Sequence, residues 1–176
     1  MKAIRLPCLV RYLYRYLYPR ATHVIAPSQL IAKDLRERWR VSDEKLVVLP
    51  NPVDTKWIRN QANKIKRYPG KGRRFVASGR LVDQKGFDRL ISWLRDMPPD
   101  THVTIFGEGH MRNSLIAQAN EMKVMKQLRF AGFINNPWGF YAGADAFLLT
   151  SRWEGMSNAS LEALAVGTPI IGTPQA

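Results

Sequence analysis

Residues 146–172 read AFLLTSRWEGMSNASLEALAVGTPIIG, with an apolar run at each end and a polar, glycine-containing stretch between them. The first apolar run predicts a buried strand, because it is short and followed by turn-forming residues. Ser157 and Asn158 are both good N-cap residues for the helical pattern that follows. Gly167 fits the left-handed position just past the helix end, and Pro169 prevents continuation. The segment therefore predicts strand, polar turn, helix and strand.

Two glutamates eight positions apart, Glu154 and Glu162, lie on either side of the predicted helix start. If the segment were helical throughout, their backbones would be ~12 Å apart. A helix start offers unpaired N–H groups and a positive dipole end, which together attract a phosphate. Carboxylates at this spacing could grip both ends of a nucleotide-sugar, one on sugar hydroxyls and the other on ribose hydroxyls, with the diphosphate at the helix start between them. The alternative is two solvated surface charges, since glutamate is a common helix former.

Strand and helix patterns alternate through the rest of the chain after residue 74. The predicted strands are 75–78, 102–106, 127–131, 145–149 and 170–171, and the predicted helices are about 86–96, 111–122, 138–142 and 158–165. Alternation of this kind predicts a parallel sheet covered by helices on both faces. Upstream, two short apolar strands at 24–26 and 46–49 enclose a helix at 29–40 that Ser28 could cap.

Several segments accompany the glutamate pair: FVASGRLVDQKGFDRLI (75–91), VTIFGEG (103–109), LRFAGF (128–133) and ADAFLLTS (144–151). In this order and spacing they resemble the donor-binding half of the GT-B glycosyltransferases. The family most similar is the retaining family 4, which is known for an E-x7-E motif matched here by Glu154 and Glu162. The resemblance runs from about residue 21 to the last residue. Any one piece alone is a weak signal, because Gly-x-Gly after a strand occurs in many phosphate loops and many plain turns.

The resemblance implies an α/β fold, a Rossmann-like parallel sheet with helices on both faces, which forms mainly the C-terminal domain of a GT-B protein. It assigns residues 1–53 to the end of an N-terminal acceptor domain and the hinge, and residues 75–176 to a donor-nucleotide-binding domain truncated at its C-terminus. Residues 54–74 are expected to be a linker, because they are polar, basic and contain Pro69-Gly70. The sequence is therefore expected to be a fragment.

The resemblance also assigns catalytic roles. Arg80 and Lys85 would bind the diphosphate of the donor and stabilise charge on the leaving nucleotide, and Glu154 would position hydroxyls of the donor sugar. Fixed cations lower this barrier because breaking a sugar–phosphate bond leaves negative charge on the diphosphate. Arginine can grip two oxygens, whereas lysine acts as a point charge. Both cations could instead be ordinary surface residues of a chain with 27 Lys and Arg.

Further substrate contacts are implied by the same resemblance: Gly79, Gly107, Phe133, Gly155, Met156, Ser157, Asn158 and Glu162. The glycines would allow close approach of backbone to donor or acceptor, or they are plain strand-end turns. Residues 155–158 would reach sugar and diphosphate through backbone N–H groups, and Glu162 would hold the ribose. Phe133 lies where the base-binding loop of the family begins, although an aromatic there could equally pack in the core.

No cofactor and no metal are expected. The chain has no Asp-x-Asp, and its three histidines are dispersed along the sequence. The donor half of the family supplies no obvious nucleophile, so the two glutamates are interpreted as hydroxyl ligands rather than as an acid and a base. The single cysteine excludes an intramolecular disulfide framework and fits a cytosolic, reducing compartment.

Positive charge is concentrated in two places. The net charge is +13, and no acidic residue occurs in residues 1–23 or 59–74. Such a balance favours polyanionic partners: nucleic acid, acidic lipid headgroups or phosphorylated substrates. Residues 8–18, CLVRYLYRYLY, predict a basic, aromatic, amphipathic helix that either docks on an anionic membrane surface or packs on another domain. No run approaches the roughly 20 apolar residues that span a bilayer.

The resemblance and the charge together predict a glycosyltransferase. It would move a sugar from a nucleotide-sugar, UDP-linked by resemblance, to a saccharide or lipid-linked acceptor in cell-surface polysaccharide or lipopolysaccharide synthesis, on the inner face of the cytoplasmic membrane. One alternative is a nucleotide-sugar-binding module without catalytic competence. The other is a basic nucleic-acid-binding protein, against which the chain shows no helix-turn-helix, zinc or RNP pattern.

Overall fold

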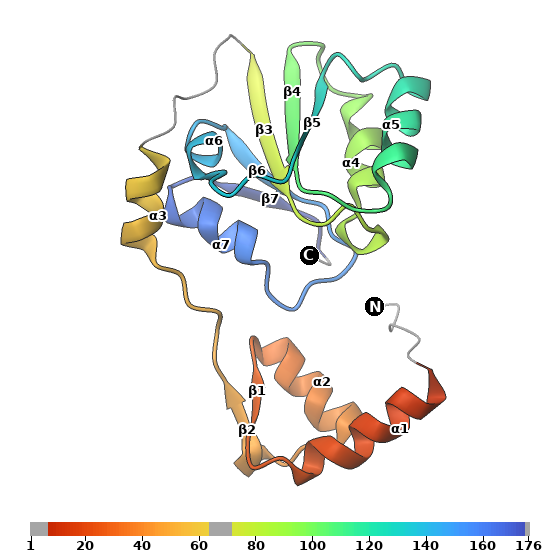
Figure 1. The fold of residues 1–176 in the computed structure, drawn as a ribbon, viewed down its shortest axis with the longest axis vertical. Coiled ribbons are helices and arrows are strands. Elements are labelled where there is room, and N and C mark those ends of the chain that lie inside the picture. Colours follow the sequence, from red (N-terminus) through yellow and green to blue (C-terminus); the bar gives the residue numbers. More distant parts are fainter. Residues whose placement is uncertain (1–6, 64–71, 175–176) are drawn as a thin grey trace. The chain divides into compact units, whose positions relative to one another are not determined.

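The computed structural model describes residues 7–63 and 72–174, which divide into two compact units, Met1–Pro52 and Val53–Ala176 (Figure 1). The first unit contains α1 (Cys8–Leu17), β1 (Val24–Ala26), α2 (Gln29–Trp39) and β2 (Leu46–Val48). The two strands pair in parallel, and α2 connects them. Ser28 caps α2 as predicted, because its side chain accepts a hydrogen bond from the backbone N of Ile31 at 3.3 Å.

The core of the first unit is small. It consists of five buried apolar residues from β1, α2 and the turn after α2: Val24, Ala26, Ala32, Leu35 and Val41. Trp39 extends this core toward α1, with its ring edge against Tyr14 at 5.6 Å and Tyr18 at 6.1 Å between centroids. The predicted helix at 8–18 is confirmed as α1, and none of its residues is buried in this unit.

The second unit is built on a five-stranded parallel sheet with the order β5-β4-β3-β6-β7. The strands are β3 (Arg73–Ser78), β4 (Thr101–Phe106), β5 (Leu128–Gly132), β6 (Ala146–Leu149) and β7 (Ile170–Gly172). Every predicted strand of this sheet is present, with its ends moved by at most two residues. The helices are α3 (Thr55–Ala62), α4 (Phe87–Leu94), α5 (Arg112–Glu121), α6 (Trp138–Ala142) and α7 (Asn158–Ala165).

The helices cover both faces of the sheet, which confirms the predicted α/β class (Figure 1). On one face α4 and α5 bury a cluster that includes Leu90, Leu94 and Leu115. On the other face α3, α6 and α7 bury a second cluster that includes Tyr141 and Phe147. Successive strand residues point to opposite faces, so β3, β4, β5 and β6 contribute to both clusters, whereas β7 contributes only Ile170, to the second.

The prediction of a linker over residues 54–74 is wrong in its first half, where α3 is a helix of the second unit. Asp54 caps this helix, because its Oδ1 accepts a hydrogen bond from the backbone N of Trp57 at 2.9 Å. Ile58 and Ala62, one turn apart, are buried against α6 and α7. The sequence did not reveal this helix, because basic residues surround its two buried apolar positions. One of these basic residues, Arg59, also holds the helix in place, since its Nε donates to the carbonyl of Ala165 at 2.7 Å. At the other end of the predicted linker, residues 73 and 74 belong to β3, and residues 64–71 lie outside the described residues.

Candidate functional site

The sheet has a topological switch point at β3. From β3 the chain runs outward through β4 to β5, and then returns to β6 on the other side of β3. In open α/β sheets, ligands bind outside the carboxyl ends of the strands at such a point. The segments that leave β3 and β6 here are residues 79–86 and 150–157, and they contain most of the residues predicted for the site.

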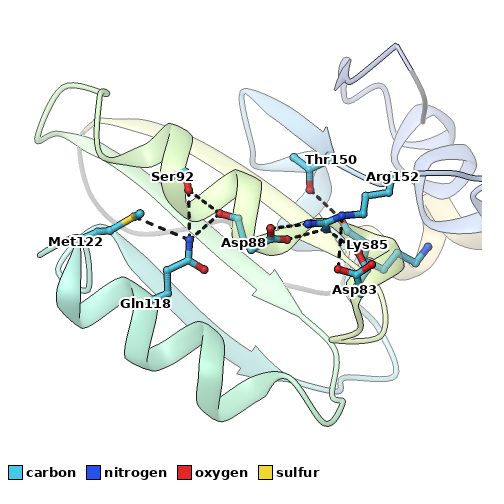
Figure 2. Close-up of polar contacts among 8 residues, drawn as sticks. All are labelled: Asp83, Lys85, Asp88, Ser92, Gln118, Met122, Thr150 and Arg152. Atoms are coloured by element: carbon cyan, nitrogen blue, oxygen red, sulfur yellow. Dashed lines mark hydrogen bonds and ion pairs between the residues drawn. The ribbon is translucent and has the colours of Figure 1, made fainter. Parts of the chain in front are cut away.

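A network of hydrogen bonds fastens these two segments together (Figure 2). The Arg152 guanidinium grips the Asp88 carboxylate with both terminal nitrogens, Nη1 to Oδ1 at 2.8 Å and Nη2 to Oδ2 at 2.6 Å. Nη1 also donates to the carbonyl of Asp83 at 2.7 Å. The Arg152 hydrogen bond lowers the pKa of Asp88, and the same bond raises the pKa of Arg152. We call the pair of Arg152 and Asp88 the loop clamp.

Further bonds on the same two segments reinforce the loop clamp. The backbone N of Arg152 donates to the carbonyl of Gln84 at 2.8 Å, and the Gln84 side chain donates to the carbonyl of Trp153 at 3.1 Å. Thr150 donates from Oγ1 to the carbonyl of Lys85 at 3.0 Å. Behind the clamp, Gln118 of α5 donates to the carbonyl of Asp88 at 3.0 Å (Figure 2). The two segments are therefore held as one structural unit.

The structure brings Lys85 and Glu154 together at the centre of this unit. Lys85 Nζ lies 2.5 Å from Glu154 Oε1, and Ser151 Oγ donates to the same oxygen at 2.7 Å. The side chains are largely withdrawn from solvent, with exposed fractions of 17% for Lys85 and 10% for Glu154. A charge-assisted bond in such surroundings is stronger than a surface pair. Lys85, which was predicted to bind the diphosphate, and Glu154, which was predicted to bind the sugar, are thus bonded to each other.

Two of the predicted glycines make room for this arrangement. A Cβ on Gly79 would come within 2.9 Å of the Lys85 Cε, so glycine lets the lysine side chain pass the end of β3. A Cβ on Gly107, where φ is +133°, would come within 2.0 Å of the Gly79 carbonyl oxygen. The packing at the strand ends therefore requires glycine at position 107, whereas a Cβ at position 79 would displace the Lys85 side chain. Their contact with a ligand stays a prediction.

Arg80 is exposed, in contrast to Lys85. Its backbone is held beside the end of β4, since the next residue, Leu81, donates to the carbonyl of Glu108 at 2.8 Å. Among the residues that the structure describes, no acidic side chain pairs with the Arg80 guanidinium. Binding of a diphosphate by Arg80 stays a prediction.

The start of α7 has the predicted cap. Ser157 Oγ accepts from the backbone N of Ser160 at 3.4 Å, and Ser160 Oγ donates to the carbonyl of Ser157 at 2.7 Å. Residues 154–157 are not helical, because the chain bends at Gly155 and turns the Glu154 side chain back onto Ser151. The separation of ~12 Å expected for a continuous helix therefore does not describe this segment. Ligand contacts of Gly155, Met156, Ser157 and Asn158 stay predictions.

Glu162 lies in the second turn of α7, whereas Glu154 precedes that helix. It is half-buried, and its Oε2 accepts a hydrogen bond of 2.8 Å from the indole Nε1 of Trp138, the first residue of α6. Trp138 did not figure among the residues predicted for the site. Its signal in the sequence was weak, because a buried indole N–H always needs an acceptor, and nothing local identifies which one.

Two aromatic residues complete the description. Phe133, just after β5, is 74% exposed, so it does not pack in the core, and its contact with a base stays a prediction. Tyr141 of α6 is fully buried, and burial raises the pKa of its hydroxyl.

Within residues 7–63 and 72–174 no group of three or more His, Cys, Asp or Glu is placed to hold a metal ion. No helix in this described part is long and apolar enough to cross a membrane.

Known proteins share this architecture. The crystal structure of Anabaena Alr3699/HepE in complex with UDP matches with a TM-score of 0.83 at 20% identity, over 98% of this chain and 50% of that chain. This likeness shows the fold, which is that of the GT-B glycosyltransferases.

Two curated relatives are glycosyltransferases that act on undecaprenol-linked sugars according to their names. The N-acetylgalactosamine-N,N'-diacetylbacillosaminyl-diphospho-undecaprenol 4-alpha-N-acetylgalactosaminyltransferase of Campylobacter jejuni is 28% identical over 163 residues, 93% of this chain and 44% of that protein. The UDP-Gal:alpha-D-GlcNAc-diphosphoundecaprenol alpha-1,3-galactosyltransferase of Escherichia coli is 32% identical over 143 residues, 74% of this chain and 37% of that protein. The chain thus spans less than half the length of these relatives.

Two family models match consecutive parts of the chain. Residues 4–57 match Glycosyltransferase Family 4, and residues 58–176 match Glycosyl transferases group 1. The second match covers more than half of the chain and includes the loop clamp, the Lys85–Glu154 pair and Glu162. On this match the chain belongs to the glycosyl transferases group 1 family.

Proposed function

We propose that this chain is the donor-binding part of a retaining glycosyltransferase that uses a UDP-linked sugar, and that the whole protein transfers the sugar to a saccharide or lipid-linked acceptor. The observation that carries the proposal is the Lys85–Glu154 pair, held by the loop clamp at the switch point of the sheet, with Glu162 beyond the α7 start. The UDP in the Alr3699/HepE crystal and the donor and acceptor named for the Escherichia coli relative support it.

The geometry suggests how charge would be handled. The Lys85 ammonium has three N–H groups. Glu154 accepts a hydrogen bond from one of them, so the diphosphate of a nucleotide-sugar can accept from another. The exposed Arg80 guanidinium can grip two further oxygens from the solvent side. As the bond between sugar and phosphate breaks, the leaving diphosphate gains negative charge, which these fixed cations stabilise.

Glu154 acts in this proposal as a ligand for sugar hydroxyls, not as a nucleophile. Its Oε1 already accepts from Lys85 and Ser151, so it holds a defined position and is weakened as a nucleophile. We therefore propose no covalent intermediate on this residue. Glu162 binds ribose hydroxyls, and the α7 start lies between the two carboxylates, where the diphosphate would pass.

Calorimetry with UDP, GDP and ADP tests this proposal on the chain 1–176. UDP should bind, and Lys85→Met should weaken its affinity by about tenfold or more, since a bond to a charged group is lost. Lys126→Met is the matched control, because Lys126 is exposed and lies just before β5, at the amino end of the strand, whereas the site is at the carboxyl ends. No heat with any of the three nucleotides, from a sample shown to be folded, would refute the proposal.

We further propose that α1 docks on anionic lipid. Its apolar and aromatic residues are exposed, with Leu9 and Tyr12 at 70%, and Arg11 and Arg15 lie on the same short helix. Such a helix inserts its apolar side between headgroups while its arginines pair with anionic lipid. Vesicles with anionic lipid should sediment the chain, salt should release it, and Leu9→Glu should weaken binding. Equal binding to neutral vesicles would contradict this mechanism.

A further inference from the structure

Trp138 and Glu162 are joined by a hydrogen bond that the proposed function does not explain. Trp138 is 7% exposed, and its only polar atom beyond the backbone, Nε1, lies 2.8 Å from Glu162 Oε2. The donor is on α6 and the acceptor is in the second turn of α7, so the bond joins two separate helices. Hydrogen bonds to a charged group are shorter and stronger than neutral ones.

The indole is held firmly by its surroundings. Trp57 of α3 packs its ring edge against Trp138, with the centroids 4.8 Å apart and the planes at 71°. The turn before α6 is tied to α3, because Asn136 donates from Nδ2 to the carbonyl of Gln61 at 3.3 Å. A donor fixed in this way fixes the acceptor that it contacts.

The bond also distinguishes the two oxygens of the carboxylate. Trp138 bonds to Oε2, so the second oxygen, Oε1, is the one that this bond leaves for a ligand. A carboxylate that is anchored through one oxygen presents the other in a constant direction. A ligand hydroxyl that meets it then loses less conformational freedom on binding than one that meets a freely rotating side chain.

We propose that Trp138 is a positioning residue that holds Glu162 so that Oε1 faces the ribose, and that it thereby makes the site selective for ribose over 2′-deoxyribose nucleoside diphosphates. This inference rests on the proposed function, in which Glu162 receives the ribose. It adds a residue that touches no ligand and acts only through the carboxylate. The selectivity comes from the geometry of one oxygen rather than from the presence of a negative charge alone.

The test compares UDP with 2′-deoxy-UDP by calorimetry on the chain 1–176. The measured quantity is the ratio of the two affinities, which a general loss of folded protein does not change. Wild-type chain should prefer UDP by about tenfold, the value of one hydrogen bond to a charged group. Glu162→Gln and Trp138→Phe should each bring the ratio close to one, and the double variant should show no further change. Trp93→Phe is the matched control, because it alters an indole that packs against Phe75 in the other apolar cluster and leaves the Trp138–Glu162 bond and its surroundings intact.

Each outcome decides a separate question. If the preference for UDP over 2′-deoxy-UDP is lost in Glu162→Gln but kept in Trp138→Phe, Trp138 does not position Glu162. The proposed function would still stand. Absence of UDP binding to folded wild-type chain would refute the proposed function and this inference with it. If Trp138→Phe does not fold, benzothienylalanine at position 138 replaces the N–H with sulfur in a ring of the same shape. If that variant has the same ratio of UDP to 2′-deoxy-UDP affinity as the wild-type chain, the inference is overturned as well.

Discussion

The Glu154 end and the Glu162 end of this site are built by different physical means. Glu154 belongs to a dense polar network, in which Lys85 and Ser151 bond its Oε1 while the loop clamp joins the two segments beneath it. Glu162 is half-buried on α7 beside the apolar cluster that α3, α6 and α7 cover, and the indole N–H of Trp138 bonds to it. Two glutamates of a single motif therefore depend on separate supports.

This difference indicates a division of labour. The polar end can carry charge that changes during a reaction, because a lysine and an arginine-held loop surround it. The apolar end is better suited to orienting a group that keeps its charge, because the Trp138 donor there is neutral. This difference agrees with the proposed binding of the diphosphate and sugar at the Glu154 end and of the uncharged ribose at the Glu162 end.

Arg152→Met should have the largest effect, and it should act at the Glu154 end. The substitution removes the loop clamp and the bond to the Asp83 carbonyl, and it leaves the Asp88 carboxylate without its partner. The free energy of unfolding should fall by about 3 kcal/mol, the value of one or two bonds to charged groups. Urea denaturation measures this loss. Arg95→Met is the control, since its pair with Asp96 lies on the surface and should contribute little.

A second pair of variants separates the two ends by ligand. Glu162→Gln should weaken UDP binding by ~1.5–3 kcal/mol, because a bond to a charged group is replaced by a neutral one. Glu154→Gln should leave UDP affinity nearly unchanged, because the proposed partner of Glu154 is the sugar and Lys85 keeps its charge. Its loss should appear with UDP-sugar. Calorimetry with both ligands decides the matter, and identical profiles for the two variants would contradict the division of labour.

The sheet could be predicted from the sequence because its strands are short apolar runs with turn residues on each side. The α7 segment was equally accessible, since its cap and the left-handed Gly167 are local signals. α3 was missed because basic residues hid the spacing of Ile58 and Ala62, which matters only once α6 and α7 are in place. Local patterns thus indicate elements, whereas burial of a sparse apolar pair depends on the tertiary fold.

The supports of the two glutamates were not visible in the sequence. Arg152 and Asp88 are 64 positions apart, and Trp138 and Glu162 are 24 apart on different helices. Neither pair has a spacing that secondary structure imposes, so only the folded sheet brings the partners together. The sequence analysis predicted that Lys85 binds phosphate and that Glu154 binds sugar, but it did not predict the hydrogen bond between these two side chains.

Ser157→Ala tests the junction between the two ends and should have a smaller effect. The substitution removes the oxygen that caps α7, and loss of a serine cap costs about 1 kcal/mol of stability. UDP affinity should fall less than in Glu162→Gln, since both glutamates keep their own supports. Denaturation and calorimetry measure the two quantities. A loss of affinity as large as that of Glu162→Gln would show that the two ends depend on the helix start rather than on separate supports.

The smallest effect concerns the pH dependence of the loop clamp. Arg152 lowers the pKa of Asp88 in the folded chain, so the unfolded chain binds the proton more readily. The pair therefore contributes stability at pH values above the unfolded pKa of about 3.9, and this contribution disappears as pH falls through the lower, folded pKa. Asp88 is partly exposed, so the charge contribution should be below about 1 kcal/mol. The stability difference between wild type and Asp88→Asn, followed by urea denaturation from pH 7 downward, should shrink below pH 4. In an Arg152→Met background the same difference should not change with pH. If the difference still shrank below pH 4 in that background, another group, rather than the loop clamp, would set the acid stability of the Glu154 end.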